Sequence, residues 1–176
     1  FIQSRILSLH EACESGNLNQ VKLLIKYSPI SIKNKNELER DALMTICFHG
    51  YHSDSFEIVS LLLQHGADPT TRDKNGCTCL MDAANGGHSD LVALLIHHGA
   101  DLNAKDNDDT SVLMYACASG STDIIQMLLS EGARLNEIDS FGCNSLQYAQ
   151  SSGNCGASLF SLLMPNIIEN TIYYNN

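Results

Sequence analysis

The sequence lacks tryptophan, contains only three prolines and carries half as many basic as acidic side chains. Ten Lys and Arg residues stand against 20 Asp and Glu residues, so the formal net charge of the 176-residue chain is −10. Neutralising the phosphates of a duplex needs a basic surface, so we expect no nucleic-acid partner and favour neutral or basic partners. No apolar run approaches the ~20 residues that span a bilayer as a helix, so we expect no membrane segment in this chain.

Charged residues are few, at 17%, while hydrophobic residues reach 44%, a balance too apolar for intrinsic disorder. The length suits one compact domain or one elongated array with a continuous core. The seven cysteines are an odd number, whereas a secreted disulfide framework uses an even one. We therefore expect reduced thiols and a location in the cytoplasm or the nucleus. The chain begins at Phe1 without a leader-like segment, which we interpret as a piece cut from a longer protein.

Internal similarity at a step of 33 residues organises the sequence. Gly-Ala pairs and single aspartates keep this step: Gly66-Ala67, Gly99-Ala100 and Gly132-Ala133, and Asp73, Asp106 and Asp139. Four good helix N-caps recur at steps of 37, 33 and 33: Asp41, Thr78, Ser111 and Asn144. Nine residues after each cap stands a glycine that would end a short helix with positive φ: Gly50, Gly87, Gly120 and Gly153. Each unit therefore predicts one helix of about two turns.

A second apolar pattern follows these glycines. It consists of Leu91, Val92, Leu94 and Leu95 after Ser89-Asp90, and of Ile124, Ile125, Leu128 and Leu129 after Thr122-Asp123. The spacing places the apolar side chains on one helical face, and Ser89 and Thr122 are expected to cap these helices. Because one pair of helices cannot bury both of its faces, the pairs must stack, which predicts an all-α solenoid.

One unit shows the full pattern. It contains Asn-Gly-Cys-Thr-Cys-Leu-Met-Asp-Ala-Ala at 75–84, Gly87-His88, Leu91-Val92, Leu94-Leu95 and Gly-Ala-Asp-Leu-Asn at 99–103. These residues resemble the ankyrin repeat family. The resemblance implies an all-α solenoid of stacked helix-turn-helix units joined by β-hairpin-like loops. We expect five units, at 1–35, 36–72, 73–105, 106–138 and 139–170, with 166–176 as a C-terminal cap or tail.

Motifs for catalysis are absent from the sequence. The chain has no Gly-rich phosphate loop, no Gly-x-Ser-x-Gly and no His-Glu-x-x-His. Cys77-x-Cys79 does not have the spacing of a zinc-ligand pair. Cys47, His49 and His52 are the other cluster of metal-ligand type, but the repeat phase predicts that Cys47 faces the core. We therefore expect a non-enzyme with no metal site and no cofactor.

Two further patterns have structural interpretations. Met44, Met81 and Met114 recur in phase, and the inter-unit position that they share predicts core packing rather than a methionine-lined groove. Asn103 resembles the loop asparagine that an asparaginyl hydroxylase modifies in some ankyrin proteins. The alternative, which we favour, is a turn asparagine whose side chain hydrogen-bonds its own backbone.

The resemblance implies that a partner binds the loop tips and the exposed face of the first helix of each pair. The candidate contact residues are Phe48, His49, Lys74, Asn75, Asp82, Asn85, Asn107, Asp108, Asp109, Tyr115, Ser119, Phe141, Tyr148 and Ser152. The four aromatic residues among them are expected to be exposed anchors, with the three aspartates as unpaired acids beside them. This predicts a groove in units three to five for an extended peptide with Lys or Arg between apolar anchors. The alternative is that the tyrosines pack along the helices and the acids are solvated.

These observations favour a non-catalytic protein-interaction module that acts as a monomer and binds a protein or peptide with basic residues. Two alternatives stay open. The chain is either a regulatory or substrate-recruiting segment of a larger enzyme or channel, or a reader of basic tails such as those of histones. The identity of the partner does not follow from the sequence, because a fold does not determine a function.

Overall fold

The computed structural model describes residues 8–153 and 163, and within them the chain forms pairs of antiparallel helices and no extended strand. The first helices of the pairs are α1 (Leu9–Glu14), α3 (Ala42–Phe48), α5 (Cys79–Asn85), α7 (Val112–Ser119) and α9 (Ser145–Ser151). The second helices are α2 (Leu18–Tyr27), α4 (Ser55–Gln64), α6 (Ser89–His97) and α8 (Thr122–Ser130), and a short 3-10 helix, η1 (Pro29–Lys33), follows α2. This arrangement confirms the all-α prediction.

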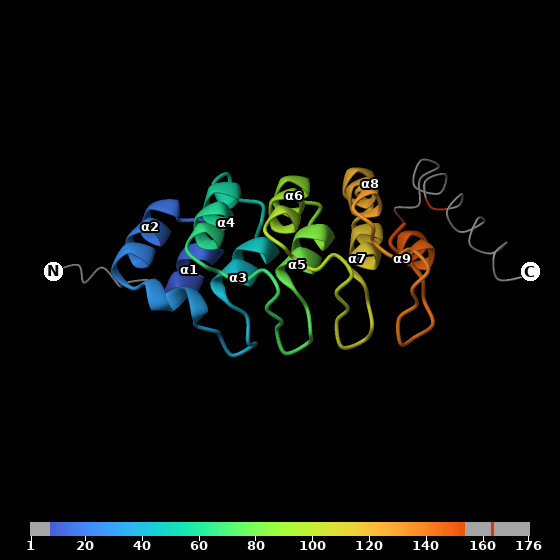
Figure 1. Cartoon of the computed structure of the whole chain (residues 1–176), viewed down its shortest axis with the longest axis horizontal. Coiled ribbons are helices and arrows are strands. Elements are labelled where there is room, and N and C mark those ends of the chain that lie inside the picture. Colours follow the sequence, from blue (N-terminus) through green and yellow to red (C-terminus); the bar gives the residue numbers. More distant parts are fainter. Residues whose placement is uncertain (1–7, 154–162, 164–176) are drawn as a thin grey trace, which may run out of the picture.

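The pairs stack side by side into an elongated array (Figure 1). The first helices form one row, in which each contacts the next, and the second helices form a parallel row. Loops between successive pairs project together to one side of the array (Figure 1). We call the pairs units one to five in chain order. The remainder of unit five and the predicted cap at 166–176 lie outside the described residues.

The first helices begin where the sequence predicts. The side chains of Asp41, Thr78, Ser111 and Asn144 each accept a hydrogen bond from the backbone N–H three residues further on. The second helices differ from the prediction, because Ser89 and Thr122 lie inside α6 and α8 and do not cap them. These helices begin directly after His88 and Ser121, and neither residue makes a side-chain cap bond.

Three of the four glycines predicted to end first helices have positive φ: Gly87, Gly120 and Gly153 (73°, 74° and 72°). Gly50 does not have this conformation, so its predicted role as a helix stop is wrong. Helix α3 instead ends at His49, with φ −97°. The extra residues that follow in unit two lead the chain away by a different path, so the left-handed turn is not needed there.

The core runs without interruption along the row of first helices. Met44, Met81 and Met114 are fully buried, which confirms that they are packing residues. Cys47 and Cys79 are also fully buried, so the thiol expected to face the core does so. The opposite faces of the first helices, together with the projecting loops, are left for contacts outside the array.

Candidate functional site

Each projecting loop is organised by one polar side chain. Oδ1 of Asp106 accepts the backbone N–H groups two and four residues further on, at 2.9 and 2.8 Å. Asp73 and Asp139 make the same two bonds in their own loops, and Asn36 makes them in unit two. These bonds close the loops into hairpin-like turns, because the side-chain oxygen accepts hydrogen bonds from backbone N–H groups that have no partner on a neighbouring strand.

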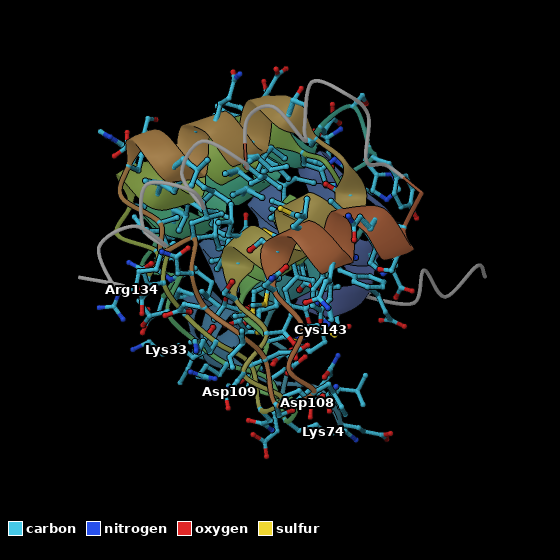
Figure 2. The ribbon with its side chains drawn as sticks, turned by 90° about the vertical axis from the view of Figure 1, so that its right-hand side faces the viewer. Lys33, Lys74, Asp108, Asp109, Arg134 and Cys143 are labelled. Carbon is cyan, nitrogen blue, oxygen red and sulfur yellow. The ribbon has the colours of Figure 1, made fainter. Side chains whose placement is uncertain are left out.

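The tips of neighbouring loops are joined to each other. Three backbone N–H groups donate to carbonyl oxygens of the preceding loop: Lys74 to Leu38 (3.1 Å), Asn107 to Asn75 (2.9 Å) and Ser140 to Asp108 (2.9 Å). Figure 2 shows Lys74, Asp108 and Asp109 together at the projecting side. The tips therefore form one continuous edge whose side chains keep a regular spacing.

The structure exposes many of the candidate contact residues. The exposed ones are Phe48, Lys74, Asn75, Asn85, Asn107, Asp108, Asp109, Phe141 and Ser152, and the partly exposed ones are His49, Asp82, Tyr115, Ser119 and Tyr148. Phe48 and Phe141 are the most accessible of the four aromatic candidates, with 57% and 76% of their surfaces exposed. They lie at opposite ends of the array, in units two and five, and do not form one anchor site.

The expectation that Tyr115 and Tyr148 are free aromatic anchors is wrong. The Tyr115 hydroxyl donates to Oδ2 of Asp106 at 2.8 Å, and the Tyr148 hydroxyl donates to Oδ2 of Asp139 at 2.7 Å. Both rings are half-buried against the row of first helices, and this burial is the main reason why the pKa of each phenol is raised. The tyrosines therefore brace the loops, and only one edge of each ring is available to a partner.

The expectation that Asp82 is an unpaired acid is also wrong. Oδ2 of Asp82 accepts a hydrogen bond from the Arg40 guanidinium, which also reaches Oδ2 of Asp73 at 3.4 Å and the Met44 carbonyl at 3.2 Å. Asp82 occupies the repeat position of Tyr115, 33 residues earlier. A second carboxylate thus faces the loop aspartate where units four and five have a phenol, and Arg40 of unit two neutralises the pair. The aspartate in unit three stands at a position where units four and five have tyrosine. This difference in the sequence is the signal that could have predicted a cation beside Asp82.

Burial raises the pKa of Asp82 to about 7, and the nearby Arg40 charge opposes this rise without cancelling it. Folding raises the pKa of this carboxyl, so the folded state binds its proton more tightly than the unfolded state does. The stability gained from this proton is present below about pH 4 and is lost as pH rises from about 4 to about 7. We expect Asp82→Asn to gain at least about 1 kcal/mol of unfolding free energy relative to the wild type between pH 4 and pH 8. Urea unfolding at several pH values measures this, with the exposed Asp108→Asn as control. Parallel pH profiles of the wild type and Asp82→Asn would contradict the assignment.

A hollow of about 230 Å³ lies on the exposed side of the first helices of units one and two. It is lined by His10, Glu14, Asn36, Leu38, Arg40, Thr45, Phe48 and His49. The sequence had placed the groove in units three to five instead. A second hollow, of about 390 Å³, lies elsewhere, between η1 and the loop around Asp68, and contains none of the candidate residues.

The candidate metal cluster does not converge. Cys47 is buried, whereas the imidazole of His52 is hydrogen-bonded to the Glu14 carbonyl at 2.8 Å. Across residues 8–153 and 163, no group of three or more His, Cys, Asp or Glu side chains is arranged to hold a metal ion. In the same part of the chain, no helix is both long and apolar enough to cross a membrane.

The Asn103 side chain makes a contact that the sequence did not predict. Its Oδ1 accepts the backbone N–H of Arg134 at 3.0 Å and so links unit three to unit four, rather than bonding its own backbone. Its own N–H donates instead to Oδ1 of Asp101 at 3.0 Å. Asn103 is therefore a bridge between neighbouring loops.

Comparison with known proteins agrees with this architecture. A family model described as "Ankyrin repeats (3 copies)" matches residues 9–106, more than half of the chain. The chain belongs to the ankyrin repeat family. A second ankyrin repeat model, for many copies, matches residues 95–149. YahD of Escherichia coli (strain K12), whose name describes it as an ankyrin repeat protein, is 36% identical over 86 residues. The match covers 48% of this ankyrin repeat chain and 43% of YahD, so the chain spans less than half of its relative.

Ankyrin repeats are in general non-catalytic modules for protein–protein interaction. The predicted family and the repeat architecture are therefore confirmed. The partner-binding residues, the unit boundaries, the monomeric state and the cellular location stay predictions.

Proposed function

We propose that this ankyrin repeat chain is a non-catalytic interaction module that binds a protein or peptide segment along its loop tips and the exposed face of its first helices. The observation that carries the proposal is the continuous edge of loop tips, held together by backbone hydrogen bonds. Such an edge offers a partner a rigid surface, and rigid surfaces lose little conformational entropy on binding. The exposed ring of Phe141 supplies apolar contact area on this edge, and the exposed ring of Phe48 supplies it at the end of α3.

The charge of the edge favours a partner with Lys or Arg residues. Glu37, Glu39, Asp108 and Asp109 are exposed along it, as is Lys74. Two further cations of these loops, Lys35 and Arg72, each donate to a backbone carbonyl of the following loop. Glu39 and Asp109 have positive φ (60° and 62°), a conformation that is unfavourable for residues other than glycine. Glu39 and Asp109 therefore add negative charge at the turn position that Gly76 and Gly142 occupy in the other two loops.

Binding to this surface is expected to weaken as salt rises. Raising the ionic strength from 0.05 to 0.5 M shortens the Debye length to roughly 4 Å, so attraction between exposed acids and a basic partner is screened. We expect peptides selected from a random library with the full chain to be rich in Lys and Arg, with a Kd at least about tenfold weaker at high salt. Fluorescence anisotropy at several salt concentrations measures this. An affinity independent of salt would contradict the acidic recognition.

The same selection separates the two alternatives. Enrichment of sequences that match histone tails, with binding that depends on every basic residue, would favour a reader of basic tails. Binding of segments from a protein that itself continues this chain would favour a regulatory segment of a larger enzyme or channel. As a monomer, the chain should elute from size exclusion as a single species whose mass by in-line light scattering is 19.2 kDa, independent of concentration.

A further inference from the structure

Unit two differs from the other units in having apolar side chains at both of two neighbouring surface positions. Leu38 lies at the loop tip, and the equivalent residues in the following units are Asn75, Asp108 and Phe141. Phe48 lies at the end of α3, and the equivalents there are Asn85, Ala118 and Ser151. Both side chains line the hollow of about 230 Å³ and remain about half exposed, at 47% and 57%. The interaction surface therefore has an apolar pocket in unit two that is not repeated along the described array.

We infer that this pocket takes one large apolar side chain of an extended partner segment, and that Lys or Arg residues on either side of it pair with Glu14, Glu37 and Glu39. The inference rests on the proposed function, and it names which part of the surface holds the partner and what the partner must contain. The volume supports a single side chain, because sites that enclose a whole small molecule measure about 300–1,000 Å³.

The walls of the pocket are held in place before a partner arrives. The guanidinium of Arg40 lies 5.0 Å from the centre of the Phe48 ring, and the centre of the His49 ring lies 5.2 Å from it in an edge-to-face arrangement. The row of rings continues from His49 to Tyr51, which is 71% exposed and extends the apolar surface past the end of α3. Anchoring pockets with pre-ordered aromatic walls are typical of residues that dominate binding energy.

The charges around the pocket select a basic segment. The one cation in the lining, Arg40, is already engaged by Asp73 and Asp82, and its side chain is only 14% exposed, so it does not attract an acidic partner. Glu14 stands at the rim with 62% of its side chain exposed, and Glu37 and Glu39 are exposed on the adjoining loop. An extended chain moves about 3.3 Å per residue, so cations one to three residues from the anchor can reach these carboxylates.

The test selects binders for the full chain from a random peptide library and measures the affinity of the enriched synthetic peptides for variants. We expect these peptides to share one large apolar residue with Lys or Arg within three positions. Leu38→Ser and Phe48→Ser should each weaken the Kd by about tenfold, and Glu14→Lys combined with Glu37→Lys by at least as much. The matched controls are Phe56→Ser and Glu57→Lys on α4, which change an exposed aromatic and an exposed acid away from the loop tips and the first helices and should alter the Kd less than about twofold. Unchanged circular dichroism spectra show that each variant is folded.

Two results separate this inference from the proposed function. Peptides that lose affinity with Phe141→Ser or Asp108→Lys, but bind Leu38→Ser and Phe48→Ser like the wild type, overturn the pocket and leave an interaction surface on the loop tips. A library of peptides and protein fragments that yields no binder to the wild-type chain contradicts both.

Discussion

Replacing Arg40 with Met is expected to lower the free energy of unfolding by about 3 kcal/mol at pH 7, because it removes the single cation from a largely buried cluster. The Asp73 and Asp82 side chains are 3% and 11% exposed, and the Arg40 guanidinium is their shared partner. Without it, one carboxyl must stay protonated or the two must repel each other, and the Met44 carbonyl loses its donor. Methionine keeps the length of the aliphatic stem, so the change tests the charge more than the packing. Urea unfolding followed by circular dichroism measures the loss.

The repeat itself supplies the control for this change. Units four and five have Tyr115 and Tyr148 at the position of Asp82, and each phenol donates to its loop aspartate. Adding Asp82→Tyr to Arg40→Met should therefore recover more than half of the lost stability, because a phenol can donate to Asp73 and no second carboxylate remains. A double variant no more stable than Arg40→Met alone would show that Arg40 contributes through something other than neutralisation.

Replacing Asp106 with Ala is expected to cost about 3 kcal/mol, since one side chain satisfies three donors. Its Oδ1 accepts two backbone N–H groups of the loop and its Oδ2 accepts the Tyr115 hydroxyl. The loss should also weaken partner binding, because the loop tip would no longer be held in register with its neighbours. Urea unfolding and peptide affinity, measured on the same variant, report the two effects separately.

Asparagine is the matched control at this position. Asn36 organises the loop of unit two with the same two backbone bonds, so Asp106→Asn should retain most of the stability that Asp106→Ala loses. The tyrosine hydroxyl can then accept from the new amide instead of donating. Equal destabilisation by Ala and Asn would mean that the negative charge, not the hydrogen-bond geometry, stabilises the loop.

Most local patterns were predicted correctly from the sequence, apart from the caps expected at Ser89 and Thr122, whereas long-range contacts were not predicted. The caps at Asp41 and Thr78 were predictable, because a cap bond joins residues three positions apart. The ion pair between Arg40 and Asp82 was not, since it joins residues 42 positions apart in different units. The prediction that Gly50 ends its helix was wrong because unit two has an insertion that changes the path of the chain after α3.

The candidate site was predicted only in part. The projecting loops and the exposure of Phe48 and Asp108 follow from the repeat phase, which places each residue on a defined face. The hydroxyl partners of Tyr115 and Tyr148 and the hollow beside Phe48 depend on side chains from neighbouring loops and helices. The missed contacts join a loop to a helix within one unit, as for the two tyrosines, or side chains of two units, as in the hollow, and neither follows from the local residue pattern.

The sequence by itself determined the repeat, the all-α architecture, the buried face of each first helix and the acidity of the chain. These properties follow from residue patterns that repeat within each unit. They can therefore be predicted without knowing how the units pack against each other. Only the tertiary structure decided which acids are neutralised, which aromatic rings brace the loops and where an apolar pocket remains open. Those outcomes depend on the distances between side chains of different elements, within a unit or between adjacent units. A change of one residue, such as Asp82 at a tyrosine position, redirects the contacts of two units at once.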